Sequence, residues 1–266
     1  MEDDPSLGRR AALAGATVGM AHFAALARLR HETKPDGSVV TEADRAVESA
    51  IRAVLGEARP EDAILGEETG QTGTANRRWI IDPIDGTALF VTGDDRWLVL
   101  LALESAGDIT VGVAVVPARR EIWWAERGGG AYRAEFDGPA IGRPHRLALP
   151  ADPTTTLAGS RFGVVPSEPH LTPADRELIA PLTAVLRPTP WRTHAALLVA
   201  AGDLDLAVQT RGQLWDFAAT SLIVTEAGGR VTGLDGRPAP APGPTLFTRD
   251  PALHDAALRT AGVLRR

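Results

Sequence analysis

The spacing of apolar residues divides the beginning of the chain into two helices and a loop. Apolar positions recur with helical spacing over residues 8–30 and again from Thr41 to about Leu55. Thr41 is the predicted N-cap of the second helix, and Asp44 stands where a capping box needs its carboxylate. Residues 34–40, KPDGSVV, combine proline and glycine and therefore predict a turn-rich loop between the helices.

Short runs of strand-forming residues follow. A first strand is predicted at residues 63–66 and a second at 78–81, with a polar loop rich in glycine and threonine between them. Further apolar segments, separated by short polar turns, predict an antiparallel meander. These segments are residues 97–103, 108–116 and 121–126, and a fourth candidate strand at 131–133 follows the glycine turn at 128–130.

The second half of the chain alternates between strands and helices. Residues 137–153 are rich in proline and glycine and predict a boundary between two lobes, 1–145 and 146–266, of one compact unit. Beyond it, the pattern predicts strands at 156–159 and 204–208 and helices at 173–186, 195–201 and 215–227. This order of elements, in which we find no internal repeat, favours a layered α+β fold over a doubly wound parallel sheet.

Composition and charge narrow the possible functions. The chain of 266 residues is 44% hydrophobic and carries a formal net charge of -6, which argues against nucleic-acid binding. It contains no cysteine, which excludes disulfides and thiolate metal sites. Residues 11–29 are apolar but interrupted by His22 and Arg28, so they predict neither a signal peptide nor a membrane span. We therefore expect a cytoplasmic protein that binds neither nucleic acid nor a membrane.

Two acidic pairs stand at the ends of consecutive predicted strands. Glu67 and Glu68 follow the strand at 63–66, and Asp82 and Asp85 follow the next strand, within the segment WIIDPIDGTALF. If these strand ends meet, the carboxylates repel one another unless a cation or a proton compensates the charge. A set of oxygen ligands without cysteine or a nearby histidine favours a hard ion, most of all Mg²⁺.

The residues around the aspartates fit a metal site but also have a simpler interpretation. Pro83 stiffens the turn, the Ile84 carbonyl is a further candidate ligand, and Gly86-Thr87 opens a short helix whose N–H groups suit a phosphate oxygen. Asp216 lies in the first turn of the helix predicted at 215–227. Taken singly, each aspartate is better explained as a turn former or a helix cap than as a metal ligand, and the two acidic pairs at consecutive strand ends are what bring the metal site level with that interpretation.

Together, these segments resemble the inositol monophosphatase family of Mg²⁺-dependent, lithium-sensitive phosphatases. The resemblance covers about residues 8–235 and is closest to the actinobacterial histidinol-phosphate phosphatases. The residues that carry it are Gly66-Glu67-Glu68, Asp82-Pro83-Ile84-Asp85-Gly86-Thr87, Trp215-Asp216 with Ala218-Ala219, Glu226-Ala227-Gly228-Gly229 and the loop KPDGSVVTEAD. It implies a layered α-β-α-β-α sandwich, usually dimeric, with two or three Mg²⁺ ions at each active site.

The resemblance also implies roles for individual residues. The ligands of a first Mg²⁺ would be Glu67, Asp82 and the Ile84 carbonyl, and those of a second would be Asp82, Asp85 and Asp216. The water-orienting and phosphate-binding groups would be Glu67, Thr87, the Asp44 carboxylate behind Thr87, and the backbone of Gly86 and Thr87. Lys34, the one lysine of the chain, would lie in the loop that closes over the metals.

The chain departs from the family pattern on the substrate side. Leu89 replaces the usual asparagine. Counting back without gaps from Leu198-Val199-Ala200 places Trp191 and Arg192 where the family has a small or acidic pair. Gln209 stands where the family has a glutamate. These changes remove negative charge from the organic half of the substrate site. Arg192 would suit an anion or a hydroxyl-rich ring, and Trp191 would suit a base or sugar face, unless the loop is shifted and Arg192 points to solvent.

The sequence therefore predicts a Mg²⁺-dependent phosphomonoesterase that uses metal-activated water on a polyol, sugar, cyclitol or nucleotide-like phosphate. One alternative is a histidinol-phosphate phosphatase, whose amine substrate does not suit Arg192. A second is a catalytically weak binding protein, in which Trp191 blocks the pocket. His194 is interpreted as a partly buried helix residue rather than a general acid, and residues 128–130 as a hairpin turn rather than a phosphate loop.

Overall fold

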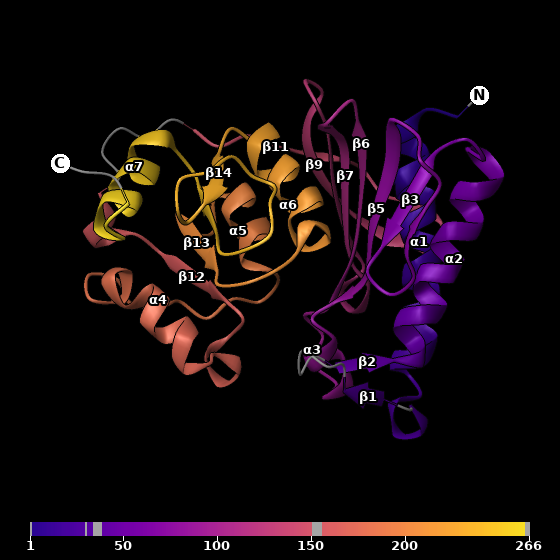
Figure 1. Ribbon diagram of the computed structural model, residues 1–266, viewed down its shortest axis with the longest axis horizontal. Coiled ribbons are helices and arrows are strands. Elements are labelled where there is room, and N and C mark those ends of the chain that lie inside the picture. The colour runs from indigo at the N-terminus through magenta and orange to yellow at the C-terminus, as the bar shows by residue number, and fades with distance from the viewer. Residues whose placement is uncertain (1, 30, 34–38, 151–155, 264–266) are drawn as a thin grey trace.

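The protein, seen in a computed structural model that describes residues 2–29, 31–33, 39–150 and 156–263, has alternating layers of helices and sheets (Figure 1). Helices α1 (Asp4–Phe23) and α2 (Glu42–Ala58) cover one face of a large sheet. Helices α5 (Ala195–Ala201) and α6 (Leu214–Glu226) lie between this sheet and a smaller one, and α4 (Pro173–Thr183) and α7 (Pro251–Thr260) lie on the far side. The predicted layered α+β fold is confirmed.

The large sheet has nine strands, in the order β10-β9-β8-β7-β6-β5-β3-β4, with β11 also paired to β9. Its strands are β3 (Ala63–Gly66), β4 (Gly70–Thr72), β5 (Arg77–Asp85), β6 (Leu98–Ser105), β7 (Asp108–Val116), β8 (Glu121–Glu126), β9 (Gly130–Asp137), β10 (Ala140–Ile141) and β11 (His145–Leu147). Among these pairings, β3 with β5 is the parallel one, with Gly66 opposite Ile81. Because parallel neighbours end at the same edge, this pair brings the two acidic segments together.

The smaller sheet has the order β12-β13-β15-β14, with β12 parallel to β13 and the other pairs antiparallel. Its strands are β12 (Phe162–Val165), β13 (Leu206–Gln209), β14 (Arg230–Gly233) and β15 (Thr245–Thr248). The remaining elements are the hairpin β1 (His31–Thr33) and β2 (Val39–Thr41), the short helix α3 (Thr87–Val91), and 3₁₀ turns at Leu26–Arg28, Pro117–Arg119, Leu157–Gly159 and Glu168–His170.

The hydrophobic core lies in three clusters that follow these layers. Successive side chains of β5 alternate between two of them, since Ile80 packs toward α5 and α6 whereas Ile81 packs toward α1 and α2. Helix α6 is buried from Phe217 to Val224, because it lies between two sheets. Its backbone comes so close to β7 that a Cβ on Gly112 would lie 2.8 Å from the Ala219 carbonyl oxygen.

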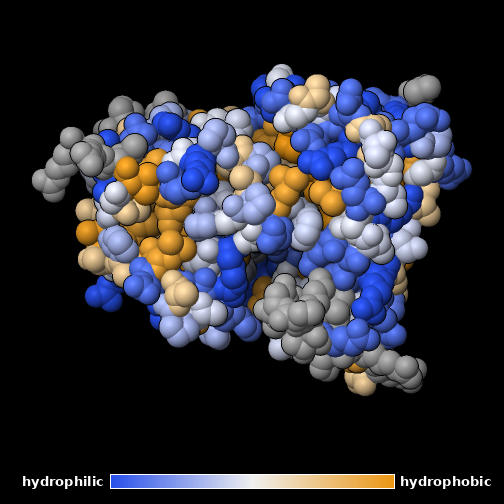
Figure 2. Space-filling model, viewed as in Figure 1, coloured by the Kyte–Doolittle hydropathy of each residue, from blue (hydrophilic) through white to orange (hydrophobic). Residues whose placement is uncertain are grey.

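The outer surfaces differ in polarity. In the view of Figure 2, the surface over α2 is mainly hydrophilic, whereas apolar residues gather in the region of the smaller sheet between α4 and α7. Within the described residues, no helix is both long and apolar enough to cross a membrane.

Several predicted elements differ from those observed. Of the strand predicted at residues 156–159, Leu157–Gly159 form a 3₁₀ turn instead, and the strand lies at Phe162–Val165. Strand β5 continues past residue 81 to Asp85, with a register shift against β6 between Asp82 and Asp85 that accommodates Pro83. The first helix begins at Asp4 and ends at Phe23. Strands β14 and β15 and helix α7 had no counterpart in the sequence prediction. The division of the chain at 145/146 stays a prediction.

Candidate active site

Three aspartates meet where β5 ends and α6 begins. Asp82 and Asp85 come from the irregular end of β5, and Asp216 comes from the first turn of α6. Each offers a carboxylate oxygen, and these oxygens all lie within 4.8 Å of one another. Asp216 is held at the helix start because its Oδ2 accepts a hydrogen bond of 2.6 Å from the backbone N–H of Gln213.

The electrostatics of this cluster require compensation. Asp82 is 1% exposed, and its Oδ1 has no hydrogen-bond partner in the part of the chain that the structure describes. Burial, and then the charges of Glu67, Asp85 and Asp216, raise the pKa of Asp82 well above its ordinary value. Burial, followed by Asp216 and Glu67, raises the pKa of Asp85 in the same way. This partly buried set of carboxylate oxygens fits a hard divalent cation.

Glu67 reaches the cluster from the neighbouring strand β3. Its backbone N–H continues the pairing of β3 with β5 by donating to the Ile81 carbonyl at 3.1 Å. The turn that follows β3 is fixed by Glu48, a fully buried residue of α2 whose Oε2 accepts the Glu68 N–H at 2.8 Å. Gly66 leaves room for that carboxylate, since a Cβ there would lie 2.1 Å from Glu48 Oε1.

Thr87 and Asp44 form a second polar unit beside the carboxylates. The Thr87 hydroxyl lies 3.1 Å from Asp44 Oδ1 and 3.0 Å from the Ile84 carbonyl oxygen. Asp44 is itself held by the predicted capping box, in which its Oδ2 accepts the Thr41 N–H and the Thr41 hydroxyl, each at 2.7 Å. Burial raises the pKa of Asp44, and these hydrogen bonds oppose that rise. The sharp turn before Thr87 uses Gly86 at a φ of 87°.

The structure gives Trp191 and Arg192 partners within the protein. Trp191 is 7% exposed, its Nε1 donates to the Val164 carbonyl at 2.8 Å, and the Arg96 guanidinium covers its ring at 4.5 Å. Arg192 forms ion pairs with Asp203 at 3.1 Å and with Glu121 at 3.5 Å. Substrate contacts by these two residues stay a prediction.

Two buried polar side chains border the cluster on the side of α5. Gln209 ends β13 and is 4% exposed, and its side chain lies next to that of His194. His194 is the N-cap of α5 and is 2% exposed, and its Nε2 lies 3.8 Å from Asp85 Oδ2. The sequence analysis interpreted His194 as a partly buried helix residue, whereas it is fully buried and faces the carboxylates. Lys34 lies outside the described residues.

Sequence reasoning also missed Glu48 and Arg96. A glutamate at a position of α2 that the helical pattern places inside the protein could have pointed to Glu48, because ionised residues are rarely buried without partners. No comparable signal marks Arg96, since its position over Trp191 depends on the packing of two loops that are distant in sequence.

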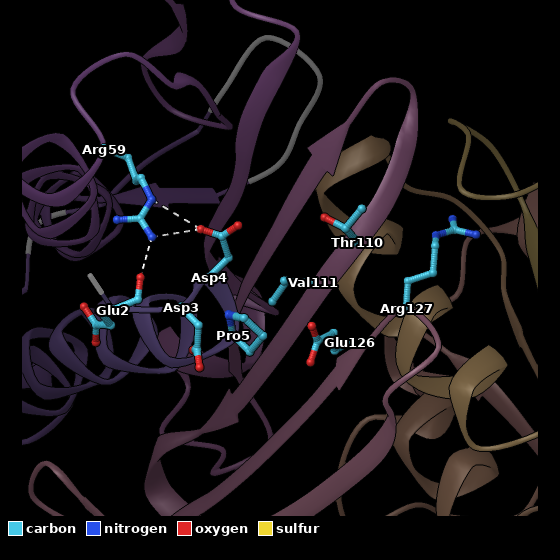
Figure 3. Close-up of a pocket in the computed structure, with 9 residues that line it drawn as sticks. All are labelled: Glu2, Asp3, Asp4, Pro5, Arg59, Thr110, Val111, Glu126 and Arg127. Carbon is cyan, nitrogen blue, oxygen red and sulfur yellow. Dashed lines mark hydrogen bonds and ion pairs between the residues drawn. The ribbon is translucent and has the colours of Figure 1, made fainter.

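A separate hollow lies at the N-terminus of α1 (Figure 3). It is lined by residues of the α1 start, the end of α2 and the strands β7 and β8, and it contains none of the clustered carboxylates. Asp4 there is paired with Arg59 at 3.1 Å. This hollow is therefore unrelated to the acidic cluster.

Comparison with known proteins agrees with the geometry of the site. The model of the inositol monophosphatase family matches residues 7–262. A histidinol-phosphatase of Mycobacterium tuberculosis is 43% identical over 237 residues, which cover 86% of this chain and 87% of that protein. A histidinol-phosphatase of Streptomyces coelicolor is 39% identical and covers 96% of both chains.

Solved structures show the same architecture. An inositol monophosphatase of Thermotoga maritima superposes with a TM-score of 0.78 at 28% identity, and the match covers 96% of this chain and 94% of that one. The acidic segments at Glu67, Asp82–Asp85 and Asp216 thus occur in a chain whose whole length follows one family. The chain belongs to the inositol monophosphatase family and is a phosphoric monoester hydrolase.

Proposed function

We propose that the protein is a Mg²⁺-dependent phosphomonoesterase that hydrolyses a small-molecule phosphate by attack of water. The observation that carries this proposal is the cluster of Asp82, Asp85 and Asp216, in which Asp82 is buried and one of its carboxylate oxygens has no hydrogen bond among the described residues. Glu67, the Ile84 carbonyl and these aspartates would hold two or three ions. When bound, such ions supply positive charge that stabilises the attacking and leaving oxygens of the phosphate ester.

The chain's own residues then orient the reactants. A Thr87 hydroxyl that donates its proton to Asp44 keeps its lone pairs free to accept a hydrogen bond from the attacking water. Asp44 can hold this orientation because its other oxygen is fixed by Thr41. Glu67 would receive a proton from the same water, and the backbone N–H groups of Gly86 and Thr87 would bind the phosphate. No nucleophilic side chain is needed.

The two relatives named above are histidinol-phosphatases, so histidinol phosphate is one candidate substrate. We favour a neutral polyol, sugar or cyclitol phosphate over histidinol phosphate. A cationic amine needs a nearby anion, whereas Gln209 is neutral and the acidic neighbours of Arg192 are already paired with it. A catalytically weak binding protein is less well supported, because Trp191 is packed against Val164 and Arg96.

Phosphate release tests the proposal directly. The purified protein would be assayed with Mg²⁺ and with a chelator on histidinol phosphate, inositol monophosphates, sugar phosphates, nucleoside monophosphates and a nucleoside bisphosphate. Asp85→Asn is the matched control, since it removes one charge and keeps the shape of the side chain. We expect Mg²⁺-dependent release that the substitution abolishes. Release that persists in the chelator or in the variant would contradict the proposal.

We also propose a cytoplasmic homodimer, on the basis of the family resemblance. Light scattering of the purified protein on a sizing column gives its molar mass in solution. A mass of twice 28.1 kDa is expected, and a monomeric mass at micromolar concentration would contradict the dimer.

A further inference from the structure

Helix α2 carries two buried carboxylates on one face, and each of them holds one of the two segments that contain the proposed metal ligands. Asp44 and Glu48 are four residues apart, so they lie one helical turn apart on the same side of the helix, and they are 1% and 0% exposed. Asp44 binds the Thr87 hydroxyl after β5. Glu48 binds the turn after β3, which begins with Glu67. One helix therefore contacts both acidic segments.

The contacts of Glu48 fix the backbone that follows Glu67. Glu48 Oε2 accepts the backbone N–H of Glu68 at 2.8 Å, and the Glu67 N–H donates to the Ile81 carbonyl at 3.1 Å. The two peptide N–H groups that flank the Cα of Glu67 are thus both held, one by the neighbouring strand and one by α2. Because the flanking peptide planes set the direction of the Cα–Cβ bond, these two hydrogen bonds aim the Glu67 side chain.

The direction of the Glu67 side chain matters for the carboxylate cluster. Burial raises the pKa of both Asp82 and Asp85, and the Glu67 charge adds to that rise, so its carboxylate lies near theirs. A rotation of the turn would change the distances between Glu67 and these aspartates. The geometry available to a cation that they share would change with them.

The other oxygen of Glu48 is held by Arg52 and Thr69. Glu48 Oε1 accepts the Arg52 Nε–H at 2.8 Å and also accepts the Thr69 hydroxyl. The same guanidinium donates to the Gly70 carbonyl at 2.6 Å and to the Thr72 hydroxyl at 3.0 Å. The carboxylate and the guanidinium together therefore hold the whole turn between β3 and β4.

Stability alone does not account for this ion pair. A buried ion pair often adds little net stability, because the loss of hydration offsets the attraction between the charges. The chain nevertheless makes room for the carboxylate, since a Cβ at Gly66 would lie 2.1 Å from Glu48 Oε1. What the pair does determine is the path of the turn.

We propose that Glu48 is a positioning residue, which sets the affinity of the site for Mg²⁺ by aiming the carboxylate of Glu67. This inference rests on the proposed phosphatase function and adds to it a residue that acts through another side chain. Glu48→Gln tests it, because the Glu68 N–H and the Arg52 Nε–H are donors on opposite oxygens of this carboxylate. A glutamine amide has one oxygen and one NH₂ group, so in either orientation its NH₂ faces a donor.

Calorimetric titration with Mg²⁺ in the absence of substrate measures the affinity directly. In Glu48→Gln the apparent Kd should rise by about 10–100-fold, and kcat at saturating Mg²⁺ should fall by a smaller factor. Asp205→Asn is the matched control, because Asp205 is also a buried carboxylate paired with arginines, Arg161 and Arg249. It should lower the melting temperature and leave the Kd unchanged. An unchanged Kd in Glu48→Gln would overturn the inference, whatever the stability of the variant.

Thr69→Val decides the question if Glu48→Gln does not fold. Thr69 is exposed, and its substitution leaves Glu48 paired with Arg52, so a folded protein is expected. Loss of the hydroxyl donor should weaken Mg²⁺ binding by about 3-fold, whereas Thr69→Ser should bind Mg²⁺ as the wild-type protein does. Equal affinities of the valine variant and the wild-type protein would overturn the inference. A wild-type protein that binds no Mg²⁺ would instead overturn the proposed function, so the two failures are distinguishable.

Discussion

The hydroxyl of Thr87 lies 3.1 Å from Oδ1 of Asp44, and this contact joins the turn after β5 to the start of α2. Asp44 serves two partners at once, because its other oxygen completes the helix cap with Thr41. The orientation of the proposed water-binding hydroxyl therefore depends on a helix cap that is far from it in sequence.

Substitution of Thr87 tests whether this hydroxyl acts on the reaction. Thr87→Ala should lower kcat by about 100-fold, since the attacking water loses the group that orients it. Thr87→Ser keeps the hydroxyl and should stay within about 5-fold of the wild-type value. Steady-state kinetics on the best substrate measure both. A serine variant as slow as the alanine variant would contradict the role.

Because the carboxylates around Asp82 repel one another, removal of one charge should make the metal-free protein more stable. In chelator, Asp82→Asn should raise the free energy of unfolding, because a buried and repelled charge is removed. The same variant should lose most of the rise in melting temperature that Mg²⁺ gives the wild-type protein. Chemical and thermal denaturation measure these two effects.

Asp94→Asn is the control with the opposite expected sign. The Arg96 guanidinium lowers the pKa of Asp94, so its charge is stabilising and its removal should lower stability. The Mg²⁺-induced rise in melting temperature should remain in this variant. If both variants shifted stability in the same direction, the repulsion argument would be wrong.

Alanine substitutions at Gly66 and Gly56 test whether the packing around the Glu48 side chain requires a glycine at position 66. Gly66→Ala should cost about 1–3 kcal/mol, because its Cβ would clash with the buried Glu48 carboxylate. A Cβ at Gly56, in α2, would have no atom of the described residues within 4 Å. Gly56→Ala should therefore raise the free energy of unfolding by up to about 1 kcal/mol, because alanine favours the helix more than glycine does. Urea unfolding compares them. Similar effects of the two substitutions would show that Gly66 is not sterically required.

The low pKa of His254 should make the folded protein less stable in acid. It is fully buried between the hydroxyls of Thr232 and Thr248, and burial lowers its pKa from 6.5 to about 4. Between these values the unfolded chain binds a proton that the folded protein excludes. Stability should therefore fall as the pH drops from about 6.5 to about 4, by up to about 3 kcal/mol from this residue.

The variant His254→Gln isolates this contribution. Its unfolding free energy should fall less steeply over the same pH range, with the remaining slope due in part to His194, whose pKa burial lowers in the same direction. Urea titrations at several pH values measure the slope. A slope equal to that of the wild-type protein would exclude His254 as a source of acid sensitivity.

The sequence predicted the parts of the fold that short-range patterns determine. The meander of β6, β7 and β8 and the bounds of α5 follow from local periodicity. The approach of Glu67 to Asp82 follows from adjacent strand ends, whereas Asp216 was expected there only from the family resemblance. Strand β12 was missed because its four residues carry little pattern. The environment of Trp191 depends on Val164 and Arg96, which no local pattern relates to it. The position of His194 as the N-cap of α5 was missed because histidine is not a usual N-cap residue.

The origin of the three aspartates in two separate layers has a consequence for folding. Asp82 and Asp85 lie on the large sheet, whereas Asp216 belongs to a helix that is buried between the sheets and far from them in the chain. Their mutual repulsion arises when these layers pack together, so without a bound cation it opposes this long-range packing step. Divalent cations should therefore speed maturation of the newly made chain as well as serve the finished enzyme.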